Sequence, residues 1–483
     1  MKLSKLLENV TLLQSIEENI DITGIAYDSR KISPGDLFVC IKGYQTDGHL
    51  YIENAIQNGA AAILVQDEVA PLSVPCLRAE NTRKALAQIA ANFYDHPERK
   101  LKTVAVTGTN GKTTVTTLIK SILEFAGKSV GLIGTNANMI RNTVLPTAHT
   151  TPESLDLFAL FAQMVEEGLE YVVMEVSSHS LFLHRVYGIP FTVATFTNLT
   201  QDHLDFHETM ENYFLAKKIL FTMCDVAIIN VDDSYGRRIM DDIGCPMVTY
   251  GVDNDATFKA ESYRISSRGV IFDLIANETT LPIRLGIPGK FSIYNCLAAF
   301  ATCTVLGIEP QKIADALLIA KGVPGRAENV YTGTDYTVLI DYAHTPDGLE
   351  NIIKTVKEFA QGRVVTLFGC GGDRDPVKRP IMGKIAGTLS DFCIITSDNP
   401  RTEEPMSIIR QIESGMKDSG GTYTVIENRR EAIRYALAEA LPGDCIILAG
   451  KGHETYQILG KEKRHFDERE VVRDILAELS EKA

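Results

Sequence analysis

Four residues, Gly108, Gly111, Lys112 and Thr113, have the types and the spacing that bind phosphate groups. A glycine-rich turn between a strand and a helix directs several backbone N–H groups at one point, and the helix dipole adds to their attraction for an anion. The Lys112 ammonium would reach the β- and γ-phosphates of a nucleotide, and the Thr113 hydroxyl would bind Mg²⁺. The match is incomplete, because Val106 stands where the pattern G-x-x-x-x-G-K-[ST] has its first glycine.

The segments around this turn decide between a phosphate site and an ordinary strand–turn–helix corner that carries a lysine. Thr103–Val106 is a β-branched run typical of a buried strand. Apolar residues recur at helical spacing after Lys112, and Gly127 is of the type that commonly ends a helix. Both patterns favour the phosphate site, so the sequence predicts that the chain binds ATP or GTP. The residues expected to contact the nucleotide are Gly108, Thr109, Asn110, Gly111, Lys112, Thr113 and Thr114.

A metal site is expected beside the phosphate turn. Glu175 and His203 follow two further expected strands, Tyr171–Val176 and Phe191–Thr197. Because the carboxyl ends of parallel strands lie on one edge of a sheet, both side chains would converge on the turn and bind a metal ion there. For His203, a surface or capping histidine is the alternative.

Composition and length narrow the class of protein. The chain has 483 residues, which is too long for a single core and predicts two or three domains. Its net charge of -14 argues against nucleic acid or an anionic membrane as the main partner. Nine cysteines without a C-x-x-C motif suit reduced thiols, and neither a secretory signal nor an apolar run of membrane-spanning length is visible. We therefore expect a cytoplasmic protein.

Strands and helices alternate along the chain, which predicts an α/β fold with three domains, 1–98, 99–328 and 329–483. The central domain would hold the phosphate turn on a parallel P-loop sheet, and the C-terminal domain would form a Rossmann-like doubly wound sheet. A meander of short strands is expected over 257–287. The other expected strands are Gly24–Tyr27, Leu37–Ile41, Ala61–Val65, Val130–Gly134, Thr337–Ile340, Arg363–Phe368, Phe392–Ile395, Thr422–Ile426 and Cys445–Leu448.

Polar loops follow the expected strands of the two outer domains. In the first domain these loops are 28–30 and 42–49, and turn chemistry alone is an alternative explanation for both. In the third domain they are 341–344, 369–374, 398–401 and 449–454. Four such loops on one rim exceed what turns require, so they predict a ligand pocket.

Eight motifs occur in a characteristic order: TGTNGKTT (107–114), EVSSH (175–179), TNLTQDHLD (197–205), GRAE (325–328), DYAHTPD (341–347), GCGGDRD (369–375), DNPR (398–401) and GKGHE (450–454). Over nearly its whole length the chain resembles the Mur ligase family, the ATP-dependent amide-forming enzymes of peptidoglycan precursor synthesis. It is most similar to the members that attach meso-diaminopimelate to UDP-N-acetylmuramoyl-L-alanyl-D-glutamate through an acyl phosphate. A lysine-adding ligase of the same family, a folylpolyglutamate synthetase and a P-loop switch module are the alternatives.

The resemblance implies roles for residues that match the family's motifs. Lys112, Glu175, His203 and Lys217 would be catalytic, and two Mg²⁺ ions would be held by Thr113, Glu175, His203 and Lys217. Lys217 and Lys218 lie on an expected helix over 211–221, where a lysine pair is ordinarily a solvated face. In the family, however, the lysine that matches Lys217 carries a CO₂-derived carbamate, an oxygen donor of the type that Mg²⁺ prefers. Lys218 is expected to remain a surface residue. Asn295, Arg326 and Asp341 would complete the ATP site.

Two further substrate sites are implied. In the UDP-linked substrate, the uridine end would be contacted by Ser29, and the muramoyl-peptide arm by Thr150, Thr151, Ser177 and Arg185. This chain has Leu183 where many members have glutamine. Contacts to diaminopimelate would come from Arg374, Asp398, Asn399, Pro400, Arg401, Gly450 and Glu454. Arg401 would select diaminopimelate over lysine, because arginine binds the distal carboxylate bidentately and lysine-adding relatives usually lack this arginine. A helix-flanking surface position is the alternative for Arg401. His344 and His453 are open candidates for the base, and a monomer is expected.

Overall fold

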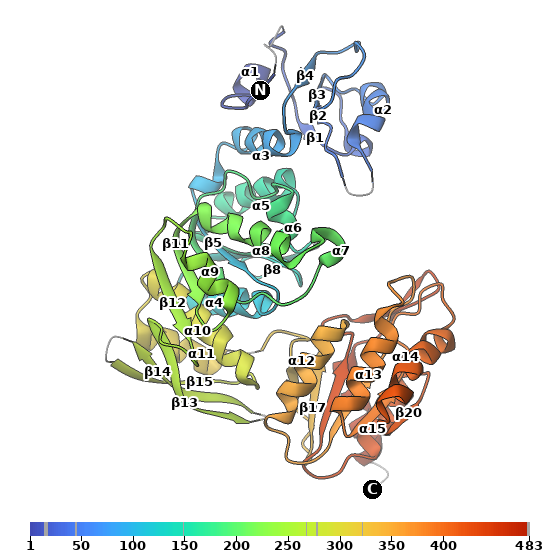
Figure 1. Ribbon diagram of the computed structural model, residues 1–483. Helices are drawn as coiled ribbons and strands as arrows, with labels where there is room; N and C mark the ends of the chain where they lie inside the picture. Colours follow the sequence, from blue (N-terminus) through green and yellow to red (C-terminus); the bar gives the residue numbers. More distant parts are fainter. Residues whose placement is uncertain are drawn as a thin grey trace. The chain divides into compact units, whose positions relative to one another are not determined.

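Strands and helices alternate through the computed structural model, which describes residues 1–13, 18–43, 46–147, 149–266, 268–276, 279–320 and 322–480 (Figure 1). The chain forms two compact units. The first comprises Met1–Thr249 and Ala298–Ile308, and the second comprises Tyr250–Leu297 and Glu309–Ala483. No helix in the described ranges combines the length and the apolar character that a membrane crossing needs.

The first unit begins with a small parallel sheet in the order β1-β2-β3-β4. Its strands are β1 (Ile25–Ala26), β2 (Leu37–Val39), β3 (Ala62–Val65) and β4 (Cys76–Arg78), and its helices are α1 (Leu3–Leu6), α2 (Ile52–Gln57) and α3 (Thr82–Phe93), with short 3₁₀ turns η1 (Ser29–Lys31), η2 (Gly48–Tyr51) and η3 (Pro97–Arg99). The Asn81 side chain caps α3 by accepting from the backbone N–H groups of Arg83 and Lys84. The three expected strands are confirmed as β1, β2 and β3, whereas β4 was not expected.

The larger sheet of the first unit holds the phosphate turn. Its strands are β5 (Lys102–Thr107), β6 (Val130–Ile133), β7 (Asn138–Ile140), β8 (Thr143–Leu145), β9 (Tyr171–Glu175), β10 (Phe191–Phe196) and β11 (Cys224–Asn230). They lie in the order β11-β10-β5-β9-β6-β7-β8, and neighbouring strands are parallel except that β7 is antiparallel to both β6 and β8. The helices are α4 (Lys112–Phe125), α5 (Ser154–Glu166), α6 (Ser178–Phe182), α7 (Leu204–His207), α8 (Met210–Lys218) and α9 (Ser234–Met240), with the 3₁₀ turn η4 (Ile219–Thr222) after α8.

Strand register brings the predicted site residues to one edge of this sheet. Val106 of β5 lies beside Glu175 of β9, and Thr107 lies beside Phe196 of β10. The phosphate turn and the loops after β9 and β10 therefore leave the sheet side by side, which is where parallel α/β sheets bind ligands.

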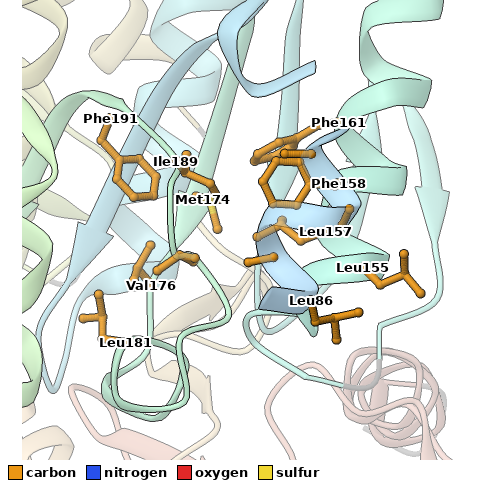
Figure 2. Packing of buried hydrophobic residues seen from close by; sticks show 14 of the residues in the cluster. Leu86, Leu155, Leu157, Phe158, Phe161, Met174, Val176, Leu181, Ile189 and Phe191 are labelled. Atoms are coloured by element: carbon orange, nitrogen blue, oxygen red, sulfur yellow. The ribbon is translucent and has the colours of Figure 1, made fainter. Parts of the chain in front are cut away.

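Apolar packing fixes the two sheets of the first unit to each other. Leu86 of α3 and Phe158 of α5 belong to one continuous buried cluster, which also contains Met174 of β9 (Figure 2). Figure 2 shows Leu155 and Leu157 of α5 on the side of Leu86, with Phe158 and Phe161 farther from it. Because α3 packs on α5, the small sheet is held against the N-terminal half of α5.

The second unit contains an antiparallel meander and a six-stranded sheet. The meander consists of β13 (Phe258–Ser266), β14 (Gly269–Ala276) and β15 (Thr279–Leu285), and it confirms the expectation for 257–287. Strand β12 (Met247–Gly251) pairs with β13, and the helices α10 (Lys290–Val305) and α11 (Pro310–Ile319) follow the meander.

The six-stranded sheet has the order β16-β17-β21-β18-β19-β20, and only β16 is antiparallel to its neighbour. The strands are β16 (Glu328–Val330), β17 (Thr337–Asp341), β18 (Val364–Phe368), β19 (Phe392–Ile395), β20 (Tyr423–Val425) and β21 (Cys445–Ala449). A hairpin of β22 (Tyr456–Leu459) and β23 (Glu462–His465) follows. The helices are α12 (Pro346–Lys357), α13 (Lys378–Leu389), α14 (Pro405–Ser419), α15 (Arg429–Ala438) and α16 (Glu468–Ser480).

Alternating side chains of this sheet build two cores, so the doubly wound prediction is confirmed. Leu339 and Ile447 pack with α12, α13 and α14 on one face, and Val338 and Ile446 pack with α15 and α16 on the other. Because both faces are covered, the parallel strands β17 to β21 appear in the sequence as continuous apolar runs. This explains why these five strands were predicted within two residues of their observed ends, whereas the antiparallel β16 was not expected.

Candidate active site

The phosphate turn has the backbone shape that the sequence predicted. Gly108 and Gly111 have φ of 146° and 85°, and Lys112 begins α4. The Lys112 ammonium donates to the carbonyl oxygens of Gly108 and Thr109, at 2.9 and 2.8 Å. The Lys112 side chain therefore folds back over the turn. A Cβ at Gly108 would lie 1.9 Å from Thr197 Oγ1, so this position admits only glycine without rearrangement.

The loop after β10 holds the phosphate turn in place. Asn198 Oδ1 accepts from the Asn110 N–H at 2.9 Å, and the Asn198 carbonyl accepts from the Thr109 N–H at 2.9 Å. The Thr109 hydroxyl lies 3.1 Å from the hydroxyl of Tyr213, and it accepts from the Thr200 N–H at 3.0 Å. Residues Asn198, Thr200 and Tyr213 were not predicted to take part. Asn198 and Thr200 lie within the TNLTQDHLD motif, which was the available signal.

Lys217 is buried beneath the turn. Its ammonium donates to the Gly108 carbonyl at 2.9 Å and lies 4.7 Å from the centre of the Tyr213 ring. Burial, together with the nearby Lys112 ammonium, holds the pKa of Lys217 well below its usual value. Lys218, by contrast, forms a salt bridge with Asp242 near the surface. Lys217 is therefore not part of a solvated helix face.

His203 lies close to the two lysines. It has φ of 52° and precedes α7, and its Nε2 lies 3.4 Å from Asp202 Oδ2. Burial lowers the pKa of His203, and the Lys112 and Lys217 charges lower it further. The ring of His179 packs at 4.8 Å from the His203 ring, and burial lowers the pKa of His179 to about 4.

Glu175 ends β9 in a buried position. Its carboxylate accepts from the backbone N–H of Thr135 at 2.9 Å and from the Thr135 hydroxyl at 3.0 Å. The Thr135 hydroxyl also lies 3.0 Å from the Thr150 hydroxyl. A Cβ at Gly134 would lie 2.4 Å from Glu175 Oε1, so the small residue leaves room for this carboxylate.

Four of the residues predicted to contact the UDP-linked substrate gather at the end of β9. The Thr151 hydroxyl donates to the Glu175 carbonyl at 2.9 Å and accepts from the Ser177 N–H at 3.2 Å, and Arg185 Nη1 donates to the Thr151 carbonyl at 3.0 Å. Thr150 adjoins them through Thr135. The fifth, Ser29, is buried in η1 of the small sheet.

In the second unit, Asp341 is fixed by two backbone donors. It accepts from the N–H groups of Ala327 and Ala343 at 2.7 and 2.8 Å. Burial raises the pKa of Asp341, although the Arg326 charge opposes this shift. The Arg326 guanidinium lies 5.2 Å from the centre of the Tyr342 ring. Asn295 is buried on α10. The histidines His344 and His453 flank the Tyr342 ring, with centroids at 4.5 and 4.8 Å.

Asn399 and Glu454, both predicted to contact diaminopimelate, are bonded to each other. Asn399 Nδ2 donates to Glu454 Oε2 at 2.9 Å, and Asn399 Oδ1 accepts from the Ile458 N–H at 3.0 Å. The fully buried ammonium of Lys451 lies 3.2 Å from Asn399 Oδ1 and 3.1 Å from Glu454 Oε2. Lys451 was missed by sequence reasoning, because it lies in the quoted GKGHE motif without a distinguishing pattern.

Arg401 is anchored to the β22–β23 hairpin through its backbone. It has φ of 52°, its N–H donates to the Ile458 carbonyl at 3.2 Å, and its Nη1 donates to the Gly372 carbonyl at 2.6 Å. It is half-buried, unlike Arg374, which is exposed and bonded to the Asp373 carbonyl. This geometry favours a fixed guanidinium over a mobile surface residue.

The remaining residues predicted to contact diaminopimelate lie around Asp398. Pro400 is buried, and Gly450, with φ of 114°, would place a Cβ 2.9 Å from Asp398 Oδ2. The same oxygen is buried without a hydrogen-bond partner and lies 3.9 Å from Arg429 Nη1.

Comparisons with known proteins match the chain to one family over nearly its whole length. The Mur ligase middle domain matches residues 106–303, the glutamate ligase domain of Mur ligases matches 325–452, and the Mur ligase family catalytic domain matches 21–94. The UDP-N-acetylmuramoyl-L-alanyl-D-glutamate–2,6-diaminopimelate ligase of Caldanaerobacter subterraneus subsp. tengcongensis is 52% identical over 480 residues, which cover 99% of each chain. That of Clostridium acetobutylicum is 49% identical over 99% of this chain and 100% of its own length. A solved structure of a ligase with the same name has a TM-score of 0.73 at 30% identity and covers 99% of both chains.

Proposed function

Because the chain belongs to the Mur ligase family, we propose that it is the ATP-dependent ligase that adds meso-2,6-diaminopimelate to UDP-N-acetylmuramoyl-L-alanyl-D-glutamate. The observation that carries this proposal is the full-length similarity, at about half identity, to relatives that bear this name. The reaction forms a peptide bond and releases ADP and phosphate.

The phosphate turn and its neighbours fit ATP with Mg²⁺. Gly108 and Gly111 leave a concave backbone, Lys112 supplies a cation, and Thr113 and Glu175 offer oxygen atoms of the hard type that Mg²⁺ prefers. Bound Mg²⁺ would neutralise part of the charge on the phosphates. We assign Asn295, Arg326 and Asp341 to ATP on the family resemblance.

Two anions must meet in the first step, when the substrate carboxylate attacks the γ-phosphorus and ADP leaves. The Lys112 ammonium would stabilise the charge that develops on the transferred group. In the second step the amine of diaminopimelate attacks the acyl carbon, phosphate leaves, and the amine loses a proton. His344 and His453 are candidates for accepting that proton, since they flank Tyr342 beside Arg326.

We further propose that Lys217 carries a carbamate and that two Mg²⁺ ions bind, with His203 as a second-site ligand. Support comes from the burial of Lys217 and from its lowered pKa, because only a neutral amine reacts with CO₂. ¹³C-bicarbonate NMR of the purified protein checks this proposal, and a carbamate signal that persists in Lys217→Met would contradict it.

Selection of the amino acid is assigned to Arg401, with Asn399 and Glu454 binding the other polar groups of diaminopimelate. The hydrogen bond from Arg401 to the Gly372 carbonyl fixes the guanidinium, and its other donors would bind the distal carboxylate. Lysine lacks this carboxylate, so it would leave the arginine charge without its partner.

We assign one binding role to each of three domains: 1–98 binds the UDP end of the substrate, 99–328 binds ATP, and 329–483 binds the amino acid. The three family matches support these divisions. We also propose a cytoplasmic monomer with neither nucleic acid nor membrane as partner, which is supported by the negative net charge and nine free cysteines.

ADP release in the presence of the UDP-linked dipeptide tests the function directly, with meso-diaminopimelate and L-lysine compared. We expect turnover to require both acceptors and to favour diaminopimelate. Turnover only with lysine would identify the lysine-adding ligase. ATP hydrolysis that is independent of both acceptors would indicate a P-loop switch module and would overturn the proposal.

A further inference from the structure

Glu153 is a buried carboxylate between two arginines. It precedes α5, two residues after Thr151, and is 8% exposed. Its Oε2 lies 3.1 Å from Arg83 Nη1, and its Oε1 lies 2.8 Å from Arg185 Nε. The two guanidinium groups come from different layers of the first unit, since Arg83 belongs to α3 and Arg185 follows α6.

Each arginine also contacts a segment with a predicted substrate role. Arg185 Nη1 donates to the Thr151 carbonyl at 3.0 Å, so it is fixed against the loop that contains Thr150 and Thr151. Arg83 Nη2 and Nε donate to the Lys42 carbonyl at 3.0 and 3.2 Å, at the start of the polar loop that ends at His49. One carboxylate therefore links a loop of the small sheet to the arginine predicted to bind the peptide arm.

A second contact joins the same two layers. Tyr27, which precedes the loop with Ser29, donates its hydroxyl to Asp156 Oδ2 at 2.5 Å. Asp156 is in the first turn of α5, three residues after Glu153. Because α3 already packs on α5 within the same buried apolar cluster (Figure 2), these polar contacts are not needed to join the layers. Their placement next to the substrate residues suggests that they set the position of side chains.

We propose that Glu153 is a positioning residue that holds Arg185 for the peptide arm of the UDP-linked substrate and, through Arg83, couples this arginine to the loop beginning at Lys42. The inference rests on the proposed function, because it assigns a role toward that substrate. Arg185 is held by a hydrogen bond to the Thr151 carbonyl on one side and by the ion pair with Glu153 on the other, so it loses less side-chain entropy on binding an anion than a mobile arginine does. Without Glu153, the Arg185 guanidinium would be mobile in the free protein, and ordering it on binding would lower the affinity for the substrate.

Three variants test this coupling. Glu153→Gln keeps the size of the side chain but removes its charge, Arg83→Met removes the link to the loop, and Glu166→Gln is the matched control at the exposed end of the same helix. Michaelis constants for the UDP-linked dipeptide, ATP and diaminopimelate are measured for each variant, together with the melting temperature. Calorimetry gives the affinity for free UDP and for the full nucleotide substrate.

We expect Glu153→Gln to raise the KM for the UDP-linked dipeptide about tenfold, with the KM for ATP and diaminopimelate within twofold of wild type. Binding of free UDP should be unchanged in Glu153→Gln and weakened in Arg83→Met, since only Arg83 contacts the loop. Once the loss measured with free UDP is subtracted, the double variant should lose less affinity for the full substrate than the sum of the two single variants, because both changes break one chain of contacts.

Three outcomes would overturn the inference: a KM for the dipeptide within twofold of wild type, a parallel rise in the KM for ATP, or additive losses in the double variant. A fall in melting temperature with unchanged affinities would show that Glu153 serves stability alone. If the wild-type protein forms no product, the proposed function fails on its own, and calorimetry still tests the coupling.

Discussion

Alanine at Gly108 tests how tightly the phosphate turn is packed. Gly108 has φ of 146°, and an added Cβ would lie 1.9 Å from Thr197 Oγ1 and 3.0 Å from the backbone N and O of Asn198. Thr197 cannot turn away freely, because its hydroxyl donates to the Asn110 carbonyl at 2.6 Å. The substitution must therefore displace the turn or break this hydrogen bond.

Gly108→Ala carries two costs in unfolding free energy, backbone strain and steric overlap, and the same substitution at Gly127 separates them. Gly127 has φ of 83°, and nothing lies within 4 Å of the place where its Cβ would stand. Gly127→Ala should cost only backbone strain, about 1–2 kcal/mol of unfolding free energy. Gly108→Ala adds the steric overlap, about 1–3 kcal/mol for overpacking. If the turn moves to relieve this overlap, ATP binding should weaken about 5- to 150-fold.

The assay combines urea unfolding with ATP affinity from calorimetry, measured for Gly108→Ala, Gly127→Ala, Thr197→Ala and the double variant Gly108→Ala/Thr197→Ala. Thr197→Ala alone should cost about 1 kcal/mol, because it loses the hydrogen bond to Asn110. In the Gly108→Ala background the same change should restore part of the ATP affinity, although the contacts with Asn198 remain. Equal losses in the two glycine variants, or a Thr197→Ala change that is harmful in both backgrounds, would refute the packing argument.

Further expectations concern the amino-acid site, the buried charges and the lysine pair. Arg401→Lys should raise the KM for diaminopimelate about ten- to hundredfold with the KM for ATP unchanged in steady-state kinetics, since a bidentate contact is lost. Arg429→Met should lower the unfolding free energy by about 3–5 kcal/mol, because it leaves the fully buried Glu468 carboxylate without its ion-pair partner. Burial raises the pKa of Glu468 above its unfolded value, so Glu468 can take up a proton in the folded state as the pH falls. Protonation removes the unpaired charge, so the loss of unfolding free energy in Arg429→Met, measured by urea unfolding, should be larger at pH 8 than at pH 6. Lys218→Ala should change the unfolding free energy by less than about 1 kcal/mol and leave ADP release intact, whereas Lys217→Ala should abolish ADP release.

The strands of the doubly wound sheet and the meander over 257–287 were predictable from sequence, whereas the β22–β23 hairpin was not. The six-stranded sheet shows continuous apolar runs because helices cover both its faces, as with Ile446 and Ile447 on neighbouring positions of β21. Strand β23 consists of exposed Glu462–His465, whose residue types carry no strand signal. It forms through pairing with β22, whose Ile458 carbonyl accepts from the Arg401 N–H. The β22–β23 pairing crosses only the short turn at Gly460 and Lys461, but the contact that holds β22 comes from Arg401, which is distant in sequence and leaves no local pattern.

The site divides in a similar way. Gly108, Gly111 and Lys112 were predictable because a single turn contains the whole arrangement, so local spacing carries it. Lys217 could not be distinguished from a solvated lysine by pattern, since its burial depends on a carbonyl more than a hundred residues away. Glu153 gave no signal at all, because an acidic residue near a helix start is expected for any helix. Contacts between layers decide its role, and only the fold brings them together.

The position of Lys217 also bears on why it would be modified. Its ammonium and that of Lys112 donate to the same Gly108 carbonyl, and each charge opposes the other in a buried place. A carbamate on Lys217 would reverse the sign of this interaction, since a negative group would then lie near the Lys112 ammonium. The arrangement that disfavours a second ammonium thus favours the carbamate in two ways, by supplying the neutral amine that reacts with CO₂ and by stabilising the product. The same reversal would provide oxygen atoms beside the phosphate turn, and oxygen is the ligand atom that Mg²⁺ prefers.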